Sequence, residues 1–184
     1  MPKANAAVHI SLTPLDPDLR ALREPRTSPP AARLNTIRTL SQAGIPTGVL
    51  VAPVIPGLTD HEMPSLITAA VEVGARFAGY VTLRLPHAVA PLFKEWLARH
   101  FPKRKDKVLN RIRAMRRGQL NDSRFGSRMR GQGIYADQIS QLFHAACRKA
   151  GLPEGCEPDL STAAFRQPGR KVQLESSLAQ KPGA

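Results

Sequence analysis

The chain has 184 residues, of which 42% are hydrophobic, and its formal net charge at pH 7 is +13. This length suffices for a domain with a buried core, and no apolar run approaches the roughly 18 residues that a membrane-spanning helix requires. The polar first residues lack a signal-peptide pattern, so we expect a cytoplasmic protein without a membrane partner.

Strands and helices are predicted to alternate through the N-terminal part of the chain. Alternating polar and apolar residues predict a strand over 7–13, and a proline-rich loop over 14–27 follows it. The pattern then predicts helices over 28–44, 60–73 and 89–100, with further strands over 47–53 and 78–85. Such alternation is typical of an α/β fold with a parallel sheet and right-handed crossovers.

The predicted strand–helix units are too few for a complete barrel. A closed eight-fold (β/α) barrel takes about 250 residues, so we predict a partial (β/α) barrel of parallel strands over residues 1–101. A C-terminal helical region is predicted over 102–151, and an irregular tail over 152–184. The helical region consists of a basic helix over 103–117, a glycine-rich loop over 118–133 and an amphipathic helix over 134–150.

Positive charge is concentrated in this helical region. Residues 103–130 include eleven basic and two acidic side chains, a net charge of +9. A helix that presents Arg111, Arg113 and Arg116 can bind phosphates with salt-sensitive affinity, which makes nucleic acid a candidate partner. The alternative is a solvated or acid-paired surface, because Phe125 is the single aromatic residue of the stretch and a base-stacking platform is not expected.

The predicted strands place polar side chains near their C-terminal ends, where barrel enzymes build their sites. We predict that Tyr80 and Arg84 face a substrate. A guanidinium at the end of a buried strand needs a carboxylate or phosphate, and for Arg84 an internal acidic residue and a ligand both remain open. Alternation assigns these side chains to the inner faces of the strands: His9, Ser11 and Thr13; Gly48, Leu50 and Ala52; Tyr80, Thr82 and Arg84.

Neither the cysteines nor the histidines have the spacing of a metal site. Cys147 and Cys156 fit no Cys-x2-Cys pattern and are predicted to be free thiols. His61 and His87 have no second ligand three or four residues away. An iron–sulfur cluster needs three or four thiolates, so this chain alone is not expected to bind one.

Residues 44–60 carry the most specific pattern in the sequence, a buried strand that leads through a Pro56-Gly57 turn to a new helix. Together with Glu24-Pro25-Arg26 upstream and the run over 121–131, this segment resembles the C-terminal half of a radical S-adenosylmethionine (SAM) enzyme. It is most similar to the spore-photoproduct-lyase-like proteins, which are often labelled DNA repair photolyases. The resemblance covers residues 7–150.

The resemblance implies where SAM would lie. In these enzymes a polar group of the fourth barrel strand faces the methionine or ribose end of SAM, and this position falls on Ser11 and Thr13. The adenine lies against the backbone of the fifth strand, which corresponds to Ala52 and Pro53, where a small side chain permits close approach. Arg26 would meet the carboxylate of SAM.

The resemblance also implies what the chain lacks. The family holds a [4Fe-4S] cluster on a Cys-x3-Cys-x2-Cys motif. One electron from the cluster cleaves SAM to methionine and a 5′-deoxyadenosyl radical, which abstracts a substrate hydrogen. No such motif occurs in this sequence, so we predict weak SAM affinity and no enzymatic activity for the chain alone.

Three interpretations of the chain result. In the first, it is a fragment whose partner is the missing N-terminal half of the barrel, and its strand over 7–13 leaves an open sheet edge. In the second, it is a standalone basic module that binds nucleic acid without catalysis. In the third, it is a non-catalytic subunit that completes a barrel with a separate, cysteine-bearing chain.

Overall fold

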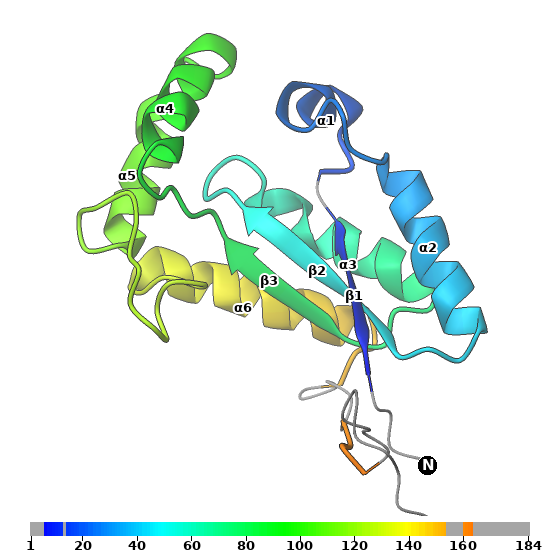
Figure 1. Ribbon diagram of the computed structural model, residues 1–184. Helices are drawn as coiled ribbons and strands as arrows, with labels where there is room; N and C mark the ends of the chain where they lie inside the picture. Colours follow the sequence, from blue (N-terminus) through cyan, green and yellow to red (C-terminus); the bar gives the residue numbers. More distant parts are fainter. Residues whose placement is uncertain (1–5, 13, 154–159, 164–184) are drawn as a thin grey trace, which may run out of the picture.

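The computed structural model describes residues 6–12, 14–153 and 160–163 (Figure 1). No helix among these residues is long and apolar enough to cross a membrane. The elements are, in chain order, β1 (Val8–Leu12), α1 (Pro17–Arg23), α2 (Pro30–Gln42), β2 (Thr47–Val54), the short 3-10 helix η1 (Asp60–Glu62), α3 (Met63–Glu72), β3 (Ala78–Thr82), α4 (Val89–His100), α5 (Lys105–Met115) and α6 (Ile134–Lys149).

The strands form a parallel sheet in the order β1-β2-β3, which confirms the predicted α/β class. The register aligns Leu12 with Val51, and Val51 with Tyr80. Residues aligned in this way point to the same face of the sheet. Strands that are consecutive in the sequence are therefore neighbours in space. The described residues contain this three-stranded sheet and no closed barrel.

One predicted loop contains a helix. The carboxylate of Asp16 accepts hydrogen bonds from the amides of Asp18 and Leu19 at 2.9 and 3.3 Å, and Pro17 occupies the first helical position. Both features favour the start of a helix. The interpretation of residues 14–27 as a loop is therefore wrong over Pro17–Arg23.

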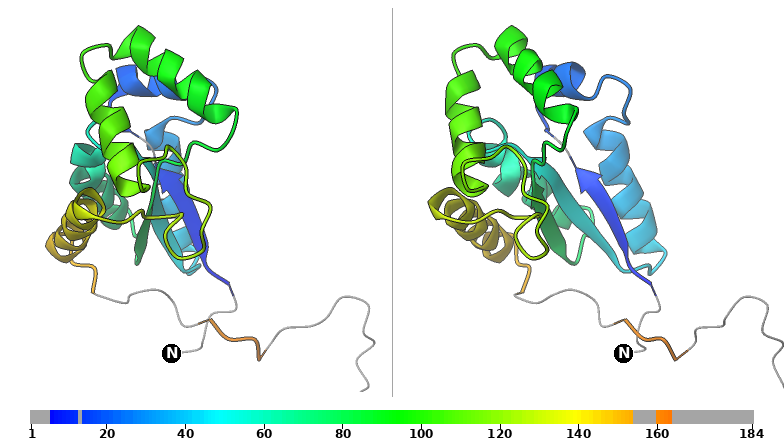
Figure 2. Two further views of the ribbon diagram at one scale, coloured as in Figure 1. Left: turned by 90° about the vertical axis from the view of Figure 1, so that its left-hand side faces the viewer. Right: turned by 60° about the vertical axis from the view of Figure 1, so that its left-hand side comes forward.

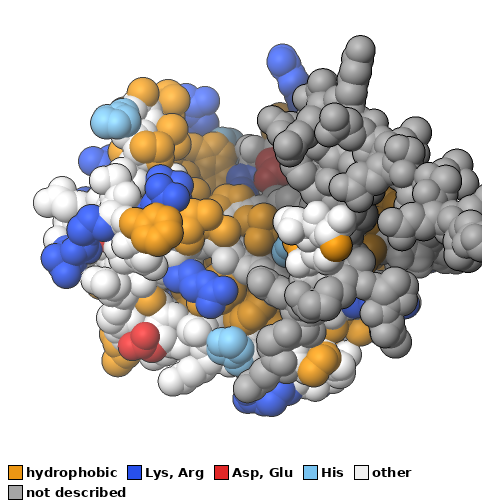
Figure 3. All heavy atoms as spheres, turned by 60° about the horizontal axis from the view of Figure 1, so that its bottom comes forward, with side chains coloured by type: hydrophobic (Ala, Val, Ile, Leu, Met, Phe, Trp, Pro, Cys, Tyr) orange, Lys and Arg blue, Asp and Glu red, His pale blue; other side chains and the backbone are white. Residues whose placement is uncertain are grey.

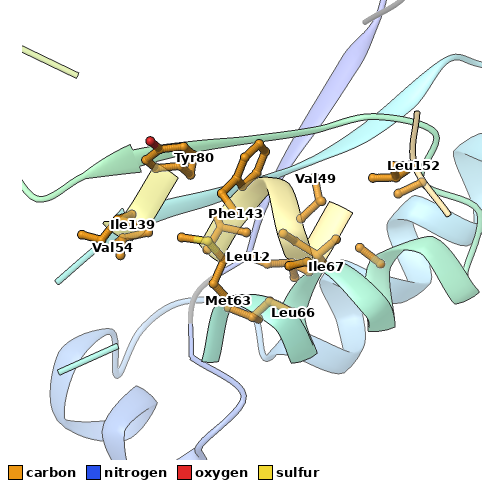
Figure 4. Packing of buried hydrophobic residues seen from close by; sticks show 14 of the residues in the cluster. Leu12, Val49, Val54, Met63, Leu66, Ile67, Tyr80, Ile139, Phe143 and Leu152 are labelled. Atoms are coloured by element: carbon orange, nitrogen blue, oxygen red, sulfur yellow. The ribbon is translucent and has the colours of Figure 1, made fainter. Parts of the chain in front are cut away.

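The helices between the strands cover one face of the sheet. A single core cluster combines Leu12, Val51 and Tyr80 of the strands with Ile37 of α2, side chains of α3, and Phe143 of α6. Figure 2 shows α3 and α6 on the same side of the sheet. In Figure 4 the side chains of the strands and of these two helices point toward one another. The helix predicted over 134–150 thus contributes to the core of the sheet.

A second, smaller core lies beyond the C-terminal ends of the strands. Leu97 of α4 packs there with Val108, Leu109 and Ile112 of α5 and with residues of the segment after β2, Ile55 and Leu58. The apolar residues of α5 recur at three- and four-residue spacing, so one stripe of this basic helix is buried. The remaining face of α5 carries its charged side chains.

The outer edge of β1 has no strand partner in the part of the chain that the structure describes. The Val8 amide donates to the Pro46 carbonyl at 2.9 Å, so by the alternation of a parallel ladder His9 and Ser11 direct their backbone groups away from β2. One of these outward groups is satisfied locally, because Nη1 of Arg33 in α2 donates to the Ser11 carbonyl at 2.9 Å.

The outer edge of β3 is covered in part by the segment between α5 and α6. The Val49 amide donates to the Phe77 carbonyl at 3.0 Å, so Thr82, which has the opposite parity to Phe77, directs its backbone outward. The Thr82 amide donates to the Met129 carbonyl at 2.9 Å. The chain after α5 therefore returns to the last strand of the sheet.

Replacing Gly48 by alanine is expected to destabilise the fold. A Cβ atom at Gly48 would lie 2.0 Å from Cδ2 of Phe77 and 2.6 Å from its carbonyl oxygen, so the neighbouring strand must move. We expect Gly48→Ala to lower the free energy of unfolding by about 1–3 kcal/mol in urea titrations. Gly79→Ala is the matched control, because its Cβ would meet Leu50 Cδ1 at 3.3 Å. Equal stabilities of the two variants would contradict this packing.

Candidate functional site

The face of the sheet opposite the helices carries a mixture of small, polar and apolar side chains. Ser11, Leu50 and Gly79 are aligned across the three strands on this face, and all three are half-buried. The Ser11 hydroxyl donates to the Ala52 carbonyl at 3.2 Å. The structure thus brings together Ser11 and Ala52, two of the residues predicted to contact SAM, beside Pro53 at the end of β2.

The other predicted SAM contacts are not brought to this point. Thr13 lies outside the described residues. Arg26 is exposed between α1 and α2. It is Arg33, which the sequence did not single out, that reaches the end of β1, and its Nη2 pairs with the Glu24 carboxylate at 3.2 Å. The Glu24-Pro25-Arg26 segment is therefore attached to β1 through the Glu24–Arg33 ion pair.

Tyr80 was predicted on the inner face with Leu50, and the structure contradicts this. Leu50 aligns with Gly79, so Tyr80 points to the helix face. Its side chain is buried, and its ring lies 4.8 Å from that of Phe143, centroid to centroid (Figure 4). A shift of one residue in the register between strands reverses the faces of all residues in a strand. Tyr80 is a core residue.

Arg116, predicted as a nucleic-acid contact, is 2% exposed. Its Nη1 donates to the Arg128 carbonyl at 2.9 Å, and its Nη2 donates to Thr82 Oγ1 at 2.9 Å and to the Leu83 carbonyl at 3.0 Å. The guanidinium thus joins the end of α5, the end of β3 and the segment before α6. Because it is enclosed in the protein, Arg116 cannot lie in an exposed basic surface, and that assignment is wrong.

Arg84 lies beside Arg116, just beyond β3. Burial lowers the pKa of Arg116, the charge of Arg84 lowers it further, and the charge of Asp122 raises it in part. Nη1 of Arg84 lies 3.9 Å from the Met129 sulfur, and its Nε is buried without a hydrogen-bond partner. Among the described residues no carboxylate forms an ion pair with Arg84. The end of β3 therefore concentrates positive charge, as an anion-binding site would.

The other two arginines predicted to contact nucleic acid are engaged on the surface. Arg111 Nη1 lies 3.5 Å from the Asp60 carboxylate, and its guanidinium stacks 5.2 Å from the Tyr135 ring beside a hollow of about 70 Å³. Arg113 donates to the Asn110 side chain at 3.0 Å. Both partners lie within the chain, which reduces what these two residues can offer a phosphate backbone.

The described residues hold no group of three or more cysteine, histidine or acidic side chains that fits a metal ion. Cys147 is a half-buried free thiol on α6, and Cys156 lies outside the described residues. An iron–sulfur cluster therefore does not fit this part of the chain on its own.

Glu62 and Arg23 form a partly buried charge cluster near the end of β1. Burial raises the pKa of the Glu62 carboxyl above its usual range, while the charge of His61 and a hydrogen bond from the Leu15 amide lower it in part. Burial also lowers the pKa of Arg23, whose Nη1 is buried without a hydrogen-bond partner. These groups link α1 and the residues before it to η1 at some electrostatic cost.

Known proteins resemble parts of this chain. A 98-residue segment, 52% of the chain, is 36% identical to the uncharacterized protein Rv2578c of Mycobacterium tuberculosis and to the uncharacterized protein Mb2609c of Mycobacterium bovis, and it covers 29% of each. A 54-residue segment, 29% of the chain, is 35% identical to 18% of the uncharacterized protein ORF301 of Acidianus two-tailed virus. The matched segment thus spans under a third of these relatives' length. No protein-family model and no solved structure matches the chain.

Removing the Arg116 guanidinium is expected to destabilise the protein strongly. Arg116→Met leaves the buried Thr82 hydroxyl and the part-buried Leu83 and Arg128 carbonyls without their donor, at a cost of about 3 kcal/mol in the free energy of unfolding. Arg113→Met makes the same change at a half-buried position of α5 and is expected to cost less than about 0.5 kcal/mol. Chemical denaturation of both variants measures the difference. Similar losses would show that Arg116 does not join these elements.

Neutralising Glu62 is expected to change the free energy of unfolding by an amount that depends on pH. Because the pKa of Glu62 is raised in the folded protein, its stabilising contribution is complete below the unfolded pKa and is lost as pH rises through the folded pKa. Glu62→Gln should therefore match the native chain near pH 4 and become the more stable of the two toward about pH 7. Glu72→Gln, at an exposed position of α3, is the control. A pH-independent difference for Glu62→Gln would contradict the assignment.

Proposed function

We propose that this chain is the C-terminal wall of a radical SAM barrel and provides the side of the barrel against which the nucleoside of SAM lies. The observation that supports this most is the sheet topology. β1, β2 and β3 are neighbours in chain order, and α2 and α3, which lie between them in the chain, pack on one face. A doubly wound sheet has helices on both faces, whereas a barrel wall has them only outside.

The free face of the sheet has the shape that a flat ligand requires. Ala52 carries only a methyl group, so a planar ring can approach the backbone closely there, whereas the Leu50 side chain lies over Gly79. Ser11 lies beside Ala52 and offers a hydroxyl that already donates to the Ala52 carbonyl at 3.2 Å. In this proposal the Ser11 hydroxyl holds the strand end in place and faces the ribose of the cofactor.

The remainder of the site must come from outside this segment. In the intact family the iron–sulfur cluster supplies one electron for SAM cleavage, but the described residues do not fit that cluster. The proposed partner is accordingly the N-terminal half of a barrel, placed against the outer edge of β1. Arg84, at the end of β3, would then face the substrate side of the barrel mouth, where its charge, with the buried charge of Arg116 behind it, favours an anionic substrate.

A standalone nucleic-acid-binding module is the second candidate. Its support is the exposed charge at the start of α5, where Lys103 and Arg104 just before the helix and Lys107 in its first turn are exposed to solvent. The arginines first assigned to this role are engaged elsewhere, as described above. The barrel proposal therefore accounts for more of the structure than the basic helix does.

Titration of the isotope-labelled chain with SAM, followed by amide NMR shifts, tests the proposal. We expect weak binding, with a dissociation constant of about 1 mM or above, and shifts confined to the ends of β1 and β2 around Ser11 and Ala52. Ala52→Leu should abolish the shifts because it fills the place of the ring. Ala98→Leu, at an exposed position of α4, should leave them unchanged. Shifts elsewhere in the chain, or shifts that persist in Ala52→Leu, would contradict the proposal.

A further inference from the structure

The segment between α5 and α6 displays an aromatic ring in solvent. We name residues 117–131 the arginine arch. Phe125, near its middle, is 91% exposed, more than any other large hydrophobic side chain among the described residues. A single exposed apolar residue is common on protein surfaces. The significance of Phe125 therefore depends on what holds it there and what surrounds it.

The arginine arch is held in place by internal hydrogen bonds. The Asp122 carboxylate accepts from the Arg124 amide at 3.1 Å, from Arg124 Nε at 2.9 Å and from the Ser127 hydroxyl at 3.1 Å. These donors hold the pKa of Asp122 well below its usual range. Arg116 fixes the far side of the arch through the Arg128 carbonyl. The ring of Phe125 is thus presented from an ordered base.

Positive charge accompanies the ring. The arginine arch contains four arginines and one acidic residue, Asp122. The guanidinium of Arg128 lies 5.5 Å from the centre of the Phe125 ring. On the side formed by α5 and the arch, Figure 3 shows basic side chains standing beside hydrophobic ones, with few acidic side chains among them. The arginine arch thus combines one exposed aromatic ring with several guanidinium groups that can bind anions.

We propose that the arginine arch binds single-stranded nucleic acid, with Phe125 stacked on one base and its arginines on the neighbouring phosphates. Stacking on an aromatic side chain needs an unpaired base, and arginine binds phosphate with two parallel hydrogen bonds. The arginines available for this role are Arg117, Arg128 and Arg130, because the guanidinium of Arg124 is paired with the Asp122 carboxylate. The inference does not rest on SAM binding, because none of its residues lies on the free face of the sheet.

Other occupants fit the arginine arch less well. An apolar protein surface that covered Phe125 would also remove water from Arg128 without supplying a counter-charge, which is costly. An acidic protein surface would pair with the arginines but would leave the ring without a stacking partner. A lipid bilayer would need more apolar area than one phenylalanine provides. Nucleic acid uses both the ring and the charges.

Fluorescence anisotropy of the full chain with labelled single strands tests the inference. Oligothymidine and oligouridine of about 20 nucleotides are suitable probes, since stacking sites span roughly 4–16 nucleotides. We expect affinity to fall with salt, with a log–log slope of about −2 for three phosphate contacts. Phe125→Ala should weaken binding about tenfold and leave the slope unchanged. Phe125→Trp should restore binding.

Matched variants distinguish the contribution of base stacking to the affinity from the contribution of charge. Arg128→Gln combined with Arg130→Gln should reduce the magnitude of the salt slope by about 1.4. Leu92→Ala, which truncates a 66% exposed side chain on α4, should bind like the native chain. Since Phe125 is almost fully exposed, its variants should unfold at the native temperature. Unchanged affinity of Phe125→Ala, or equal affinity for duplex and single strand, would overturn the inference. So would Phe125-dependent binding to anionic vesicles without any binding to the oligonucleotides.

Discussion

Helices α2 and α3, which connect the strands, pack on one face of the sheet, and the rest of the structure depends on this constraint. The buried face takes the large apolar residues, represented by Leu12, Val51 and Tyr80 in one row across the strands. The other face is left with Ser11, Leu50 and Gly79, which are half-buried. Parallel sheets are usually covered on both faces. In a barrel both faces of the sheet are covered, because the opposite wall covers the inner face.

The Arg116 guanidinium is the second organising interaction. With three hydrogen bonds it ties the basic C-terminal region to the end of β3, so that α5 and the segment before α6 are fixed relative to the sheet. A buried guanidinium needs such hydrogen-bond partners to be tolerated. The same contact places Arg84 nearby and anchors the arginine arch. The positive charge of this region therefore gathers at the strand ends, where barrel enzymes bind their substrates.

The elements could largely be predicted from the sequence, and the failures have physical causes. The alternation around Val8 and the apolar run around Val49 predicted strands, since both periods are local properties of the chain. The prediction of the sheet face on which Tyr80 lies was wrong, because that face depends on the register between strands, which is a tertiary property. Helix α1 was missed although Asp16 before Pro17 is a capping signal. The burial of Arg116 had no sequence signal, because a run of basic residues looks the same whether one of them is buried or not.

The central claim is that this chain is one wall of a barrel whose cluster-binding half is encoded with it. Sequencing about 600 bases upstream of the Met1 codon tests this most directly, since half of a barrel of about 250 residues needs less than that length. The account predicts a Cys-x3-Cys-x2-Cys motif there, in one of the reading frames, followed by strand and helix patterns. An unrelated gene without such a motif in this region would contradict it.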